Sequence, residues 1–183
     1  MRIAHICPLI LLLPFLVAGQ EPVGIKNFHS VNANLYRGAQ PTDEGFKALA
    51  KMGVKTVIDL RDRSQQHRHE ERIVEGLGMK FLSVPMTMSA PTDEQIAKVL
   101  GQFESSTAWP VFVHCLGGRD RTGTAIACYR IAHDGWDSQK ALAEAREYGM
   151  RLLDIGMERY VRQFHSPSAQ VSGGPNGRSV ATP

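Results

Sequence analysis

One short segment carries side chains whose types and spacing suit nucleophilic chemistry on an anion. It is HCLGGRDRT, residues 114–122, in which Cys115 lies six positions before Arg121, with Gly117 and Gly118 between them. A cysteine thiolate is a strong nucleophile, and the planar guanidinium of arginine can bind two oxygens of a phosphate at once. Glycines let several backbone N–H groups approach one anion. The segment therefore predicts a cysteine that attacks a bound oxyanion such as phosphate.

Two flanking elements would position this segment. The apolar run before it predicts a buried strand over residues 111–114, and the sequence after it predicts a helix over 122–133. Ligands of parallel α/β sheets lie beyond the carboxyl ends of the strands, and a helix N-terminus carries a partial positive charge. Cys115 would lie at both places, so we expect its pKa to be lowered and its thiolate to be favoured.

Two other anion-binding loops have a similar outline. Gly118 and Gly123 have the glycine spacing of the nucleotide-binding P-loop, but Thr124 and Ala125 follow where that motif needs a lysine and a hydroxyl residue. Rhodanese-type sulfurtransferases also place a cysteine between a strand and a helix, but their loop is shorter than this one. A buried structural cysteine, with Arg121 in a surface ion pair, is the remaining non-catalytic interpretation.

The rest of the chain alternates strand and helix patterns. We predict strands over residues 34–38, 54–60, 79–85 and 111–114, and helices over 42–52, 64–76, 92–103, 122–133, 137–149 and 152–164. Such alternation is typical of an α/β fold, here a single domain with a mostly parallel central sheet flanked by helices.

The first residues have the pattern of a signal peptide. Met1 and Arg2 precede an apolar run over residues 6–17, and small residues follow, so residues 1–19 are predicted to be a secretory signal cleaved near Gly19. Residues 20–165 would form the domain, and residues 166–183, rich in Ser, Gly and Pro, a disordered tail. We expect export to the periplasm or the medium, with no stable membrane anchor after cleavage.

The charge of the chain indicates which class of partner to exclude. The formal net charge is +3 and the basic residues are scattered, so no nucleic-acid partner is expected.

The three cysteines are not expected to form a disulfide. Cys7 would leave with the signal. Cys128 lies roughly 10 Å along the predicted helix at 1.5 Å per residue, whereas a disulfide needs Cα atoms within about 7 Å. We therefore expect no disulfide between Cys115 and Cys128, and we interpret Cys128 as a small buried residue.

The segment resembles a known signature. Residues 114–122 match H-C-x-x-G-x-x-R-[S/T], which is similar to the signature of cysteine-dependent phosphatases of the protein-tyrosine and dual-specificity superfamily. Upstream, LYRGAQP at residues 35–41 and GVKTVIDLR at residues 53–61 resemble the small dual-specificity-type phosphatases of bacteria, plants and fungi. The resemblance covers about residues 25–165 and implies a dual-specificity-phosphatase-like fold.

The resemblance also implies roles for matched positions. Cys115 would form a phosphocysteine, and Arg121 would bind the phosphate and stabilise the transition state. His114 would organise the loop and keep the pKa of the thiol low, while Thr122 would hydrogen-bond the sulfur. The substrate-binding set would be Leu116, Gly117, Gly118, Arg119, Asp120 and Arg121. Neither a metal nor a cofactor is expected.

The sequence offers two candidates for the general acid, the group that protonates the leaving oxygen. Many relatives carry an aspartate on a loop upstream of the cysteine, but residues 83–91 contain no acid here. Asp120 lies inside the loop, where a carboxylate beside a thiolate is unfavourable unless it is used or turned away. Asp93 also fits, although an acid in the first turn of a helix is favourable for local reasons alone. We favour Asp120 and keep Asp93 as the alternative. The remaining interpretation is another group, or weak activity without an acid.

Other charged residues allow two interpretations each. Residues 67–70, HRHE, suggest either a metal site or, as we prefer, an exposed helix face. Arg119 would be either a solvated charge or a contact that selects substrate. Asp59 and Asp62 are interpreted as structural, with Asp62 a further possible substrate contact.

We therefore predict an exported, monomeric phosphatase for phosphomonoesters. The substrate would be a phosphorylated protein (phosphotyrosine or phosphoserine/threonine), a phosphoinositide or an inositol phosphate. The alternative is a non-catalytic module that binds phosphate without turnover.

Overall fold

The computed structural model describes residues 22–62, 65–151 and 155–165. The predicted signal peptide, the predicted tail and the start of the last predicted helix lie outside these ranges. The strands are β1 (His29–Asn32), β2 (Leu35–Ala39), β3 (Thr56–Asp59), β4 (Lys80–Ser83) and β5 (Val111–Cys115). The helices are α1 (Asp43–Lys51), α2 (Gln65–Gly76), α3 (Asp93–Phe103), α4 (Asp120–Ala132), α5 (Ser138–Glu147) and α6 (Ile155–Gln163).

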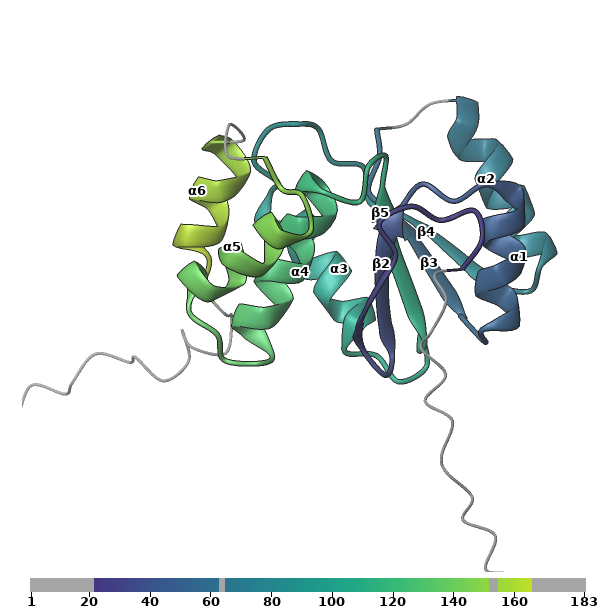
Figure 1. The fold of residues 1–183 in the computed structure, drawn as a ribbon, viewed down its shortest axis with the longest axis horizontal. Helices are drawn as coiled ribbons and strands as arrows, with labels where there is room; N and C mark the ends of the chain where they lie inside the picture. The colour runs from purple at the N-terminus through teal and green to yellow at the C-terminus, as the bar shows by residue number, and fades with distance from the viewer. Residues whose placement is uncertain (1–21, 63–64, 152–154, 166–183) are drawn as a thin grey trace, which may run out of the picture.

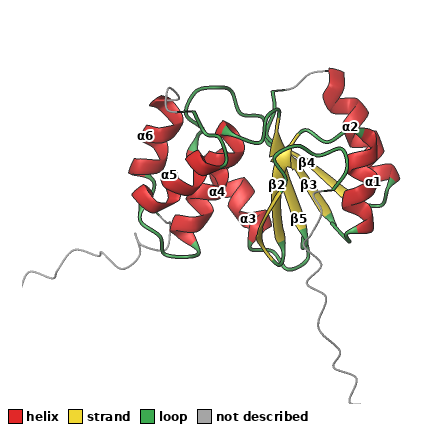
Figure 2. Cartoon of the chain, in the orientation of Figure 1, coloured by secondary structure: helices red, strands yellow, loops and turns green. Residues whose placement is uncertain are grey.

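The sheet confirms the predicted fold class. Its strand order is β1-β2-β5-β3-β4, and all neighbours are parallel except β1 and β2. Strand β1 was not predicted, because only Val31 in it is apolar and it forms a polar edge beside β2. Strand β5 lies in the centre, so the chain segment that follows it begins at the middle of the carboxyl edge (Figure 2). This is the usual place for a ligand site in a parallel α/β sheet.

Helices cover both faces of the sheet, in three layers (Figure 1). Helices α1 and α2 lie on one face, where Phe46, Leu49 and Val74 pack against Val57 and Phe112. Helices α3 to α6 lie on the other face, and their apolar side chains pack against residues such as Ile58, Val111 and Val113. Val111, Phe112 and Val113 thus alternate between the two cores, so β5 is buried on both faces. None of the helices in the described parts of the chain is both long and apolar enough to cross a bilayer.

Local signals explain where several helices begin. Thr42 and Asp137 cap α1 and α5, each accepting a hydrogen bond from a backbone N–H of the first turn. Thr92 and Gln95 form a reciprocal capping box at α3. Helix α4 starts at Asp120, two residues before the predicted Thr122, because the N–H of Gly123 already bonds the carbonyl of Arg119 at 2.7 Å.

Helix α2 corrects one sequence-based interpretation. Its residues 67–70 were expected to form an exposed polar face, and Arg68 and His69 are exposed. Glu70, however, is only 2% exposed, and the side chain of His67 is 12% exposed. Both side chains turn inward because they meet buried partners from the sheet: Asp59 of β3 for His67, and His114 of β5 for Glu70. A local sequence pattern cannot reveal such partners.

Candidate active site

Cys115 is the last residue of β5 and is only 3% exposed. It pairs in register with Ala39 of β2, and the preceding His114 pairs with both Gly38 of β2 and Asp59 of β3. Helix α4 begins five positions after Cys115, at Asp120. The structure therefore places the predicted nucleophile between the carboxyl edge of the sheet and a helix N-terminus, where partial positive charge gathers.

The carbonyl groups of the loop are held on its outer side. Leu116 O accepts from the backbone N–H of Gln40 at 3.2 Å. Gly118 O accepts from Arg37 Nη2 at 2.9 Å and from Asn27 Nδ2 at 3.0 Å. The carbonyl and N–H of a trans peptide point in opposite directions. Anchoring these oxygens therefore turns the N–H groups of the following residues, Gly117 and Arg119, toward the inside of the loop.

Gly118 is required by this close packing. Its φ is +66°, and a Cβ at this position would lie 2.4 Å from the backbone carbonyl of Gly38. Only glycine combines a positive φ with so close an approach of two backbones. The glycine in the signature therefore fixes how the loop lies on β2.

The surroundings of Cys115 favour its thiolate. Burial alone would raise the pKa of the thiol, but hydrogen bonding from Thr122, the charge of Arg121 and the N–H of Arg119 together lower it. The buried Oγ1 of Thr122 has no conventional hydrogen-bond partner among the described residues, so its hydroxyl is free to serve the sulfur. The lowered pKa predicted from the sequence is thus the direction that the structure gives.

A cavity of about 210 Å³ opens over the thiol. It is lined by Met88, Cys115, Leu116, Gly117, Arg119, Asp120, Arg121 and Arg151. Arg121 is held from behind by Met86 O, 3.3 Å from its Nη1. Arg119 is exposed and also lines the cavity, so its side chain is solvated and lies beside the place where a substrate would bind. A small cavity with three arginines and one thiolate suits a compact dianion.

The two predicted alternatives for the general acid lie in different places. Asp120 lines the cavity of Cys115, and its carboxylate accepts from the backbone N–H of Arg151 at 2.9 Å and from Arg151 Nη2 at 3.2 Å. Asp93 lines another cavity, between α3 and α6, and accepts from the hydroxyl of Tyr160 at 2.8 Å.

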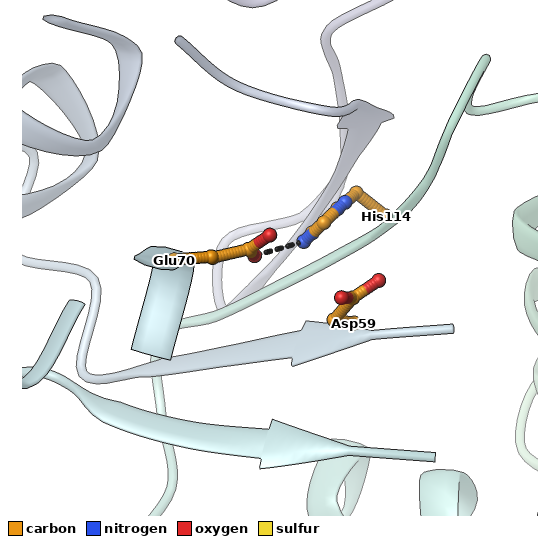
Figure 3. Close-up of side chains that lie close together, drawn as sticks. All are labelled: Asp59, Glu70 and His114. Atoms are coloured by element: carbon orange, nitrogen blue, oxygen red, sulfur yellow. Dashed lines mark hydrogen bonds and ion pairs between the residues drawn. The ribbon is translucent and has the colours of Figure 1, made fainter. Parts of the chain in front are cut away.

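A buried network of charges lies behind the loop, on the sheet side. His114, which is fully buried, places its Nε2 2.7 Å from Glu70 Oε1 (Figure 3). Arg61 bonds Glu70 and also both carboxylate oxygens of Asp59, at 2.9 and 2.8 Å. His67 Nδ1 lies 3.0 Å from the same carboxylate. The prediction that Asp59 is structural agrees with these contacts, whereas Asp62 is exposed and lies outside the lining of the cavity.

This cluster is spaced closely enough to hold a metal ion, but a cation already occupies it. Ligand atoms of Asp59, Glu70 and His114 all lie within 4.8 Å of one another. The guanidinium of Arg61 bonds both carboxylates. A metal ion would have to displace it, so the residues fit an internal ion-pair network better than a metal site.

Sequence reasoning assigned no role to several residues that support the loop. Arg37 is 1% exposed, bonds Gly118 O, and lies 4.7 Å from the ring centre of Tyr148. Burial lowers its pKa to about 10. Asn27 and Arg151 were not singled out from the sequence, and Glu70 was interpreted as part of an exposed helix face, because each acts through contacts far away in sequence. The only available signal was the pair of arginines, 37 and 61, inside the segments that carried the family resemblance.

The second buried cysteine contributes no bridge. Cys115 and Cys128 are both free, and Cys128 lies in the middle of α4 with no exposed surface. Burial raises the pKa of the Cys128 thiol strongly, and Asp93 adds to the effect. It therefore behaves as the small buried residue expected from the sequence.

Comparison with known proteins settles the family. A family model described as DSP-PTPase phosphatase fused to NAD+ kinase matches residues 20–163. The chain belongs to this family of cysteine-dependent, dual-specificity-type phosphatases. It is 32% identical over 125 residues to the dual specificity protein phosphatase TpbA of Pseudomonas aeruginosa PAO1, a match covering 67% of this chain. That match covers 55% of the relative, so the chain spans about half the length of TpbA.

Solved structures agree with this assignment. A crystal structure of a Cys-to-Ser variant of P. aeruginosa TpbA in complex with pTyr superposes with a TM-score of 0.66 at 25% identity, covering 84% of this chain and 96% of that one. The catalytic core of the PP-IP phosphatase SIW14 of S. cerevisiae has a TM-score of 0.69 at 22% identity, covering 82% and 93%. The second likeness supports the fold.

Proposed function

We propose that this chain hydrolyses phosphomonoesters through a phosphocysteine intermediate. The observation that carries the proposal is the position of Cys115, whose thiolate is favoured and which shares one small cavity with Arg121. The thiolate would attack phosphorus while loop N–H groups and Arg121 bind the phosphoryl oxygens. The bond from phosphorus to the leaving oxygen breaks, and that oxygen takes a proton. Water then attacks the phosphocysteine, which releases phosphate and restores the thiolate.

Asp120 is our choice for the group that protonates the leaving oxygen. It lines the same cavity as Cys115, whereas Asp93 lines a different one. Arg151 holds the carboxylate at the rim of the cavity through three contacts. In the second step the same carboxylate would accept a proton from the attacking water.

For the substrate, we propose a phosphotyrosyl or phosphoseryl/threonyl protein, or an inositol phosphate or phosphoinositide. The complex of the related TpbA with pTyr makes a phosphotyrosyl peptide the first substrate to test. The PP-IP phosphatase with the same fold makes inositol phosphates the second. The exposed Leu116 and Arg119 at the rim would contact the part of the substrate beyond its phosphate.

The test is direct detection of the intermediate. The protein is mixed with a phosphotyrosyl peptide or an inositol phosphate and quenched in acid, and the peptide that contains Cys115 is analysed by mass spectrometry. We expect a phosphorylated Cys115 together with release of inorganic phosphate. Phosphate binding without release would instead indicate a non-catalytic binding module, and thiocyanate formation from thiosulfate and cyanide would indicate sulfur transfer.

We also propose that the protein is exported and acts as a monomer. The support for export is the signal-like pattern of residues 1–19. Expression of the full chain followed by N-terminal sequencing tests this, with cleavage near Gly19 expected in the exported fraction. Retention of Met1 in that fraction would argue against it. Sedimentation of the purified protein tests the oligomeric state.

A further inference from the structure

The ring nitrogens of His114 both lie against groups that can only accept hydrogen bonds. Nε2 is 2.7 Å from Glu70 Oε1, a carboxylate oxygen. Nδ1 is 3.3 Å from the backbone carbonyl oxygen of Cys115. A neutral imidazole carries one N–H and one acceptor nitrogen, whereas the imidazolium cation carries two N–H groups. With Glu70 as a carboxylate, the two contacts can both be hydrogen bonds only if His114 is doubly protonated.

The charges around the ring favour the same state. His114 faces Glu70 from α2, Asp59 from β3 and Arg61 just after β3, while His67 faces Asp59 from behind. Two carboxylates and one guanidinium leave this buried group with a surplus negative charge, which a protonated His114 would neutralise. Burial would lower the pKa of His114, but Glu70 and Asp59 raise it above its ordinary value. An unpaired charge is strongly unfavourable in such surroundings.

Glu70 itself is firmly placed. Its carboxylate is 2% exposed, and it accepts from His114, from Arg61 and, at 2.9 Å, from Gln40 Nε2. Gln40 in turn follows β2 and supplies the N–H that anchors the loop carbonyl of Leu116. One carboxylate therefore connects α2 with His114 of β5 (Figure 3) and with Gln40, the residue after β2.

From these contacts we propose that Glu70 is a positioning residue for the phosphatase site, which acts by holding His114 as an imidazolium directly behind Cys115. The cation donates to the carbonyl of Cys115 and so fixes the first peptide of the loop, with its N–H on the opposite side. It also adds a buried positive charge next to the thiolate. Glu70 contacts neither the sulfur nor the cavity over it. This inference rests on the proposed function only in calling the site a phosphatase site. The protonation of His114 and the reactivity of Cys115 can be measured without turnover.

The first test needs no substitution. Nitrogen-15 NMR of histidine-labelled protein reports whether each ring nitrogen carries a proton. We expect His114, assigned by comparison with a His114→Asn variant, to show two N–H groups at neutral pH. A single N–H at neutral pH would overturn the proposal, whatever the variants do.

The second test asks whether Glu70 affects the thiol. The rate at which iodoacetamide alkylates Cys115 is measured against pH, with the modified peptide quantified by mass spectrometry so that Cys7 and Cys128 do not interfere. We expect Glu70→Gln to move the profile to higher pH by about one unit, which makes alkylation about tenfold slower on the acid side. His67→Gln is the matched control, since it disturbs the same network without touching His114 or Glu70. Its profile should follow that of the wild type.

The third test asks whether the effect passes through His114. In a His114→Asn background, Glu70→Gln should cause no further change in alkylation, because the group it acts on is gone. An equal slowing in both backgrounds would show that Glu70 acts by another route and would refute the proposal. Alkylation requires no turnover. A shifted profile in a chain without phosphatase activity would therefore support this inference while contradicting the proposed function, and an unshifted profile in an active chain would do the reverse.

Discussion

The two buried cysteines of this chain have opposite properties although they lie close together in sequence, Cys115 at the end of β5 and Cys128 in the middle of α4. Cys115 is 3% exposed and Cys128 is 0% exposed, so burial hardly differs. Yet the pKa of the Cys115 thiol is lowered and that of Cys128 is raised. Both feel desolvation as the largest influence, and it raises the pKa in each case. Only Cys115 has donors and a positive charge close enough to overcome it.

The difference shows that the functional part of the helix is its first turn. There the N–H groups have no partners within the helix, and Thr122 and Arg121 add a hydroxyl and a guanidinium. Two to three turns later the backbone groups bond one another, and Ile126, Ala127 and Cys128 simply pack in the core. The reactivity of each thiol therefore follows from its position relative to the first turn of α4, and each prediction below tests one part of that statement.

Replacing each cysteine in turn should separate a catalytic role from a structural one. Cys115→Ser should reduce hydrolysis of p-nitrophenyl phosphate by ~10³-fold or more, since the nucleophile is lost. Cys128→Ala should leave the turnover number close to that of the wild type. It should lower the free energy of unfolding by about 1 kcal/mol, because a small cavity is left in the core. Steady-state kinetics and urea unfolding measure both, and an inactive but fully folded Cys128→Ala variant would contradict the comparison.

The next effect concerns the acid in the same first turn. Asp120→Asn should slow hydrolysis of phosphotyrosine by about 10²-fold, because its leaving oxygen must be protonated. The loss should be smaller with p-nitrophenyl phosphate, whose leaving group needs less help, and the basic limb of the pH–rate profile should disappear. Asp93→Asn is the matched control at the start of α3 and should retain both rates. The reverse pattern would transfer the role to Asp93.

A smaller effect tests how the loop is held on the sheet. Gly118→Ala forces a Cβ against the carbonyl of Gly38 and places alanine at a positive φ. We expect a loss of about 1–3 kcal/mol in unfolding free energy, together with weaker inhibition by inorganic phosphate, because the loop N–H groups are displaced. Gly117→Ala is the control, since its Cβ would meet only the Arg119 side chain at 3.6 Å. Similar losses in the two variants would mean that the backbone contact with Gly38 is unimportant.

The sequence revealed the parts of this site that depend on local patterns. The strand before Cys115, the helix after it and the caps Thr92 and Asp137 all follow from residues close together in the chain. The nucleophile and Arg121 were found in the same way, since the loop is continuous. Their positions needed no knowledge of how distant segments pack.

What supports the loop could not be found in this way. Glu70 lies in QQHRHEE, which has the composition of an exposed helix, and it meets His114 across 44 positions of sequence. Arg37 lies in a short strand and meets Gly118 across 81 positions. Both contacts are decided by the order β2-β5-β3 in the sheet, which no local signal specifies. Strand β1 escaped because its polar residues provide no alternating apolar pattern.

The two thiols should also differ in how they change the stability of the fold with pH. Between the lowered pKa of folded Cys115 and its ordinary value of about 8.5, the unfolded chain binds a proton that the folded chain does not. Cys115 therefore stabilises the fold increasingly as pH rises through this window, and the contribution is lost as pH falls through the folded pKa. Cys128 behaves in the opposite sense. Above about pH 8.5 its thiol ionises only in the unfolded chain, so its contribution to stability decreases with rising pH.

Paired unfolding curves at several pH values measure this difference. Relative to wild type, Cys115→Ser should lose stability progressively as pH rises from the lowered pKa of folded Cys115 to about pH 8.5. Cys128→Ala should regain stability from there toward pH 10, because it no longer carries a thiol that ionises on unfolding. Each slope is at most about 1.4 kcal/mol per pH unit, the value for one proton. Slopes of the same sign in both variants would mean that burial, and not position relative to the first turn of α4, decides the state of each thiol.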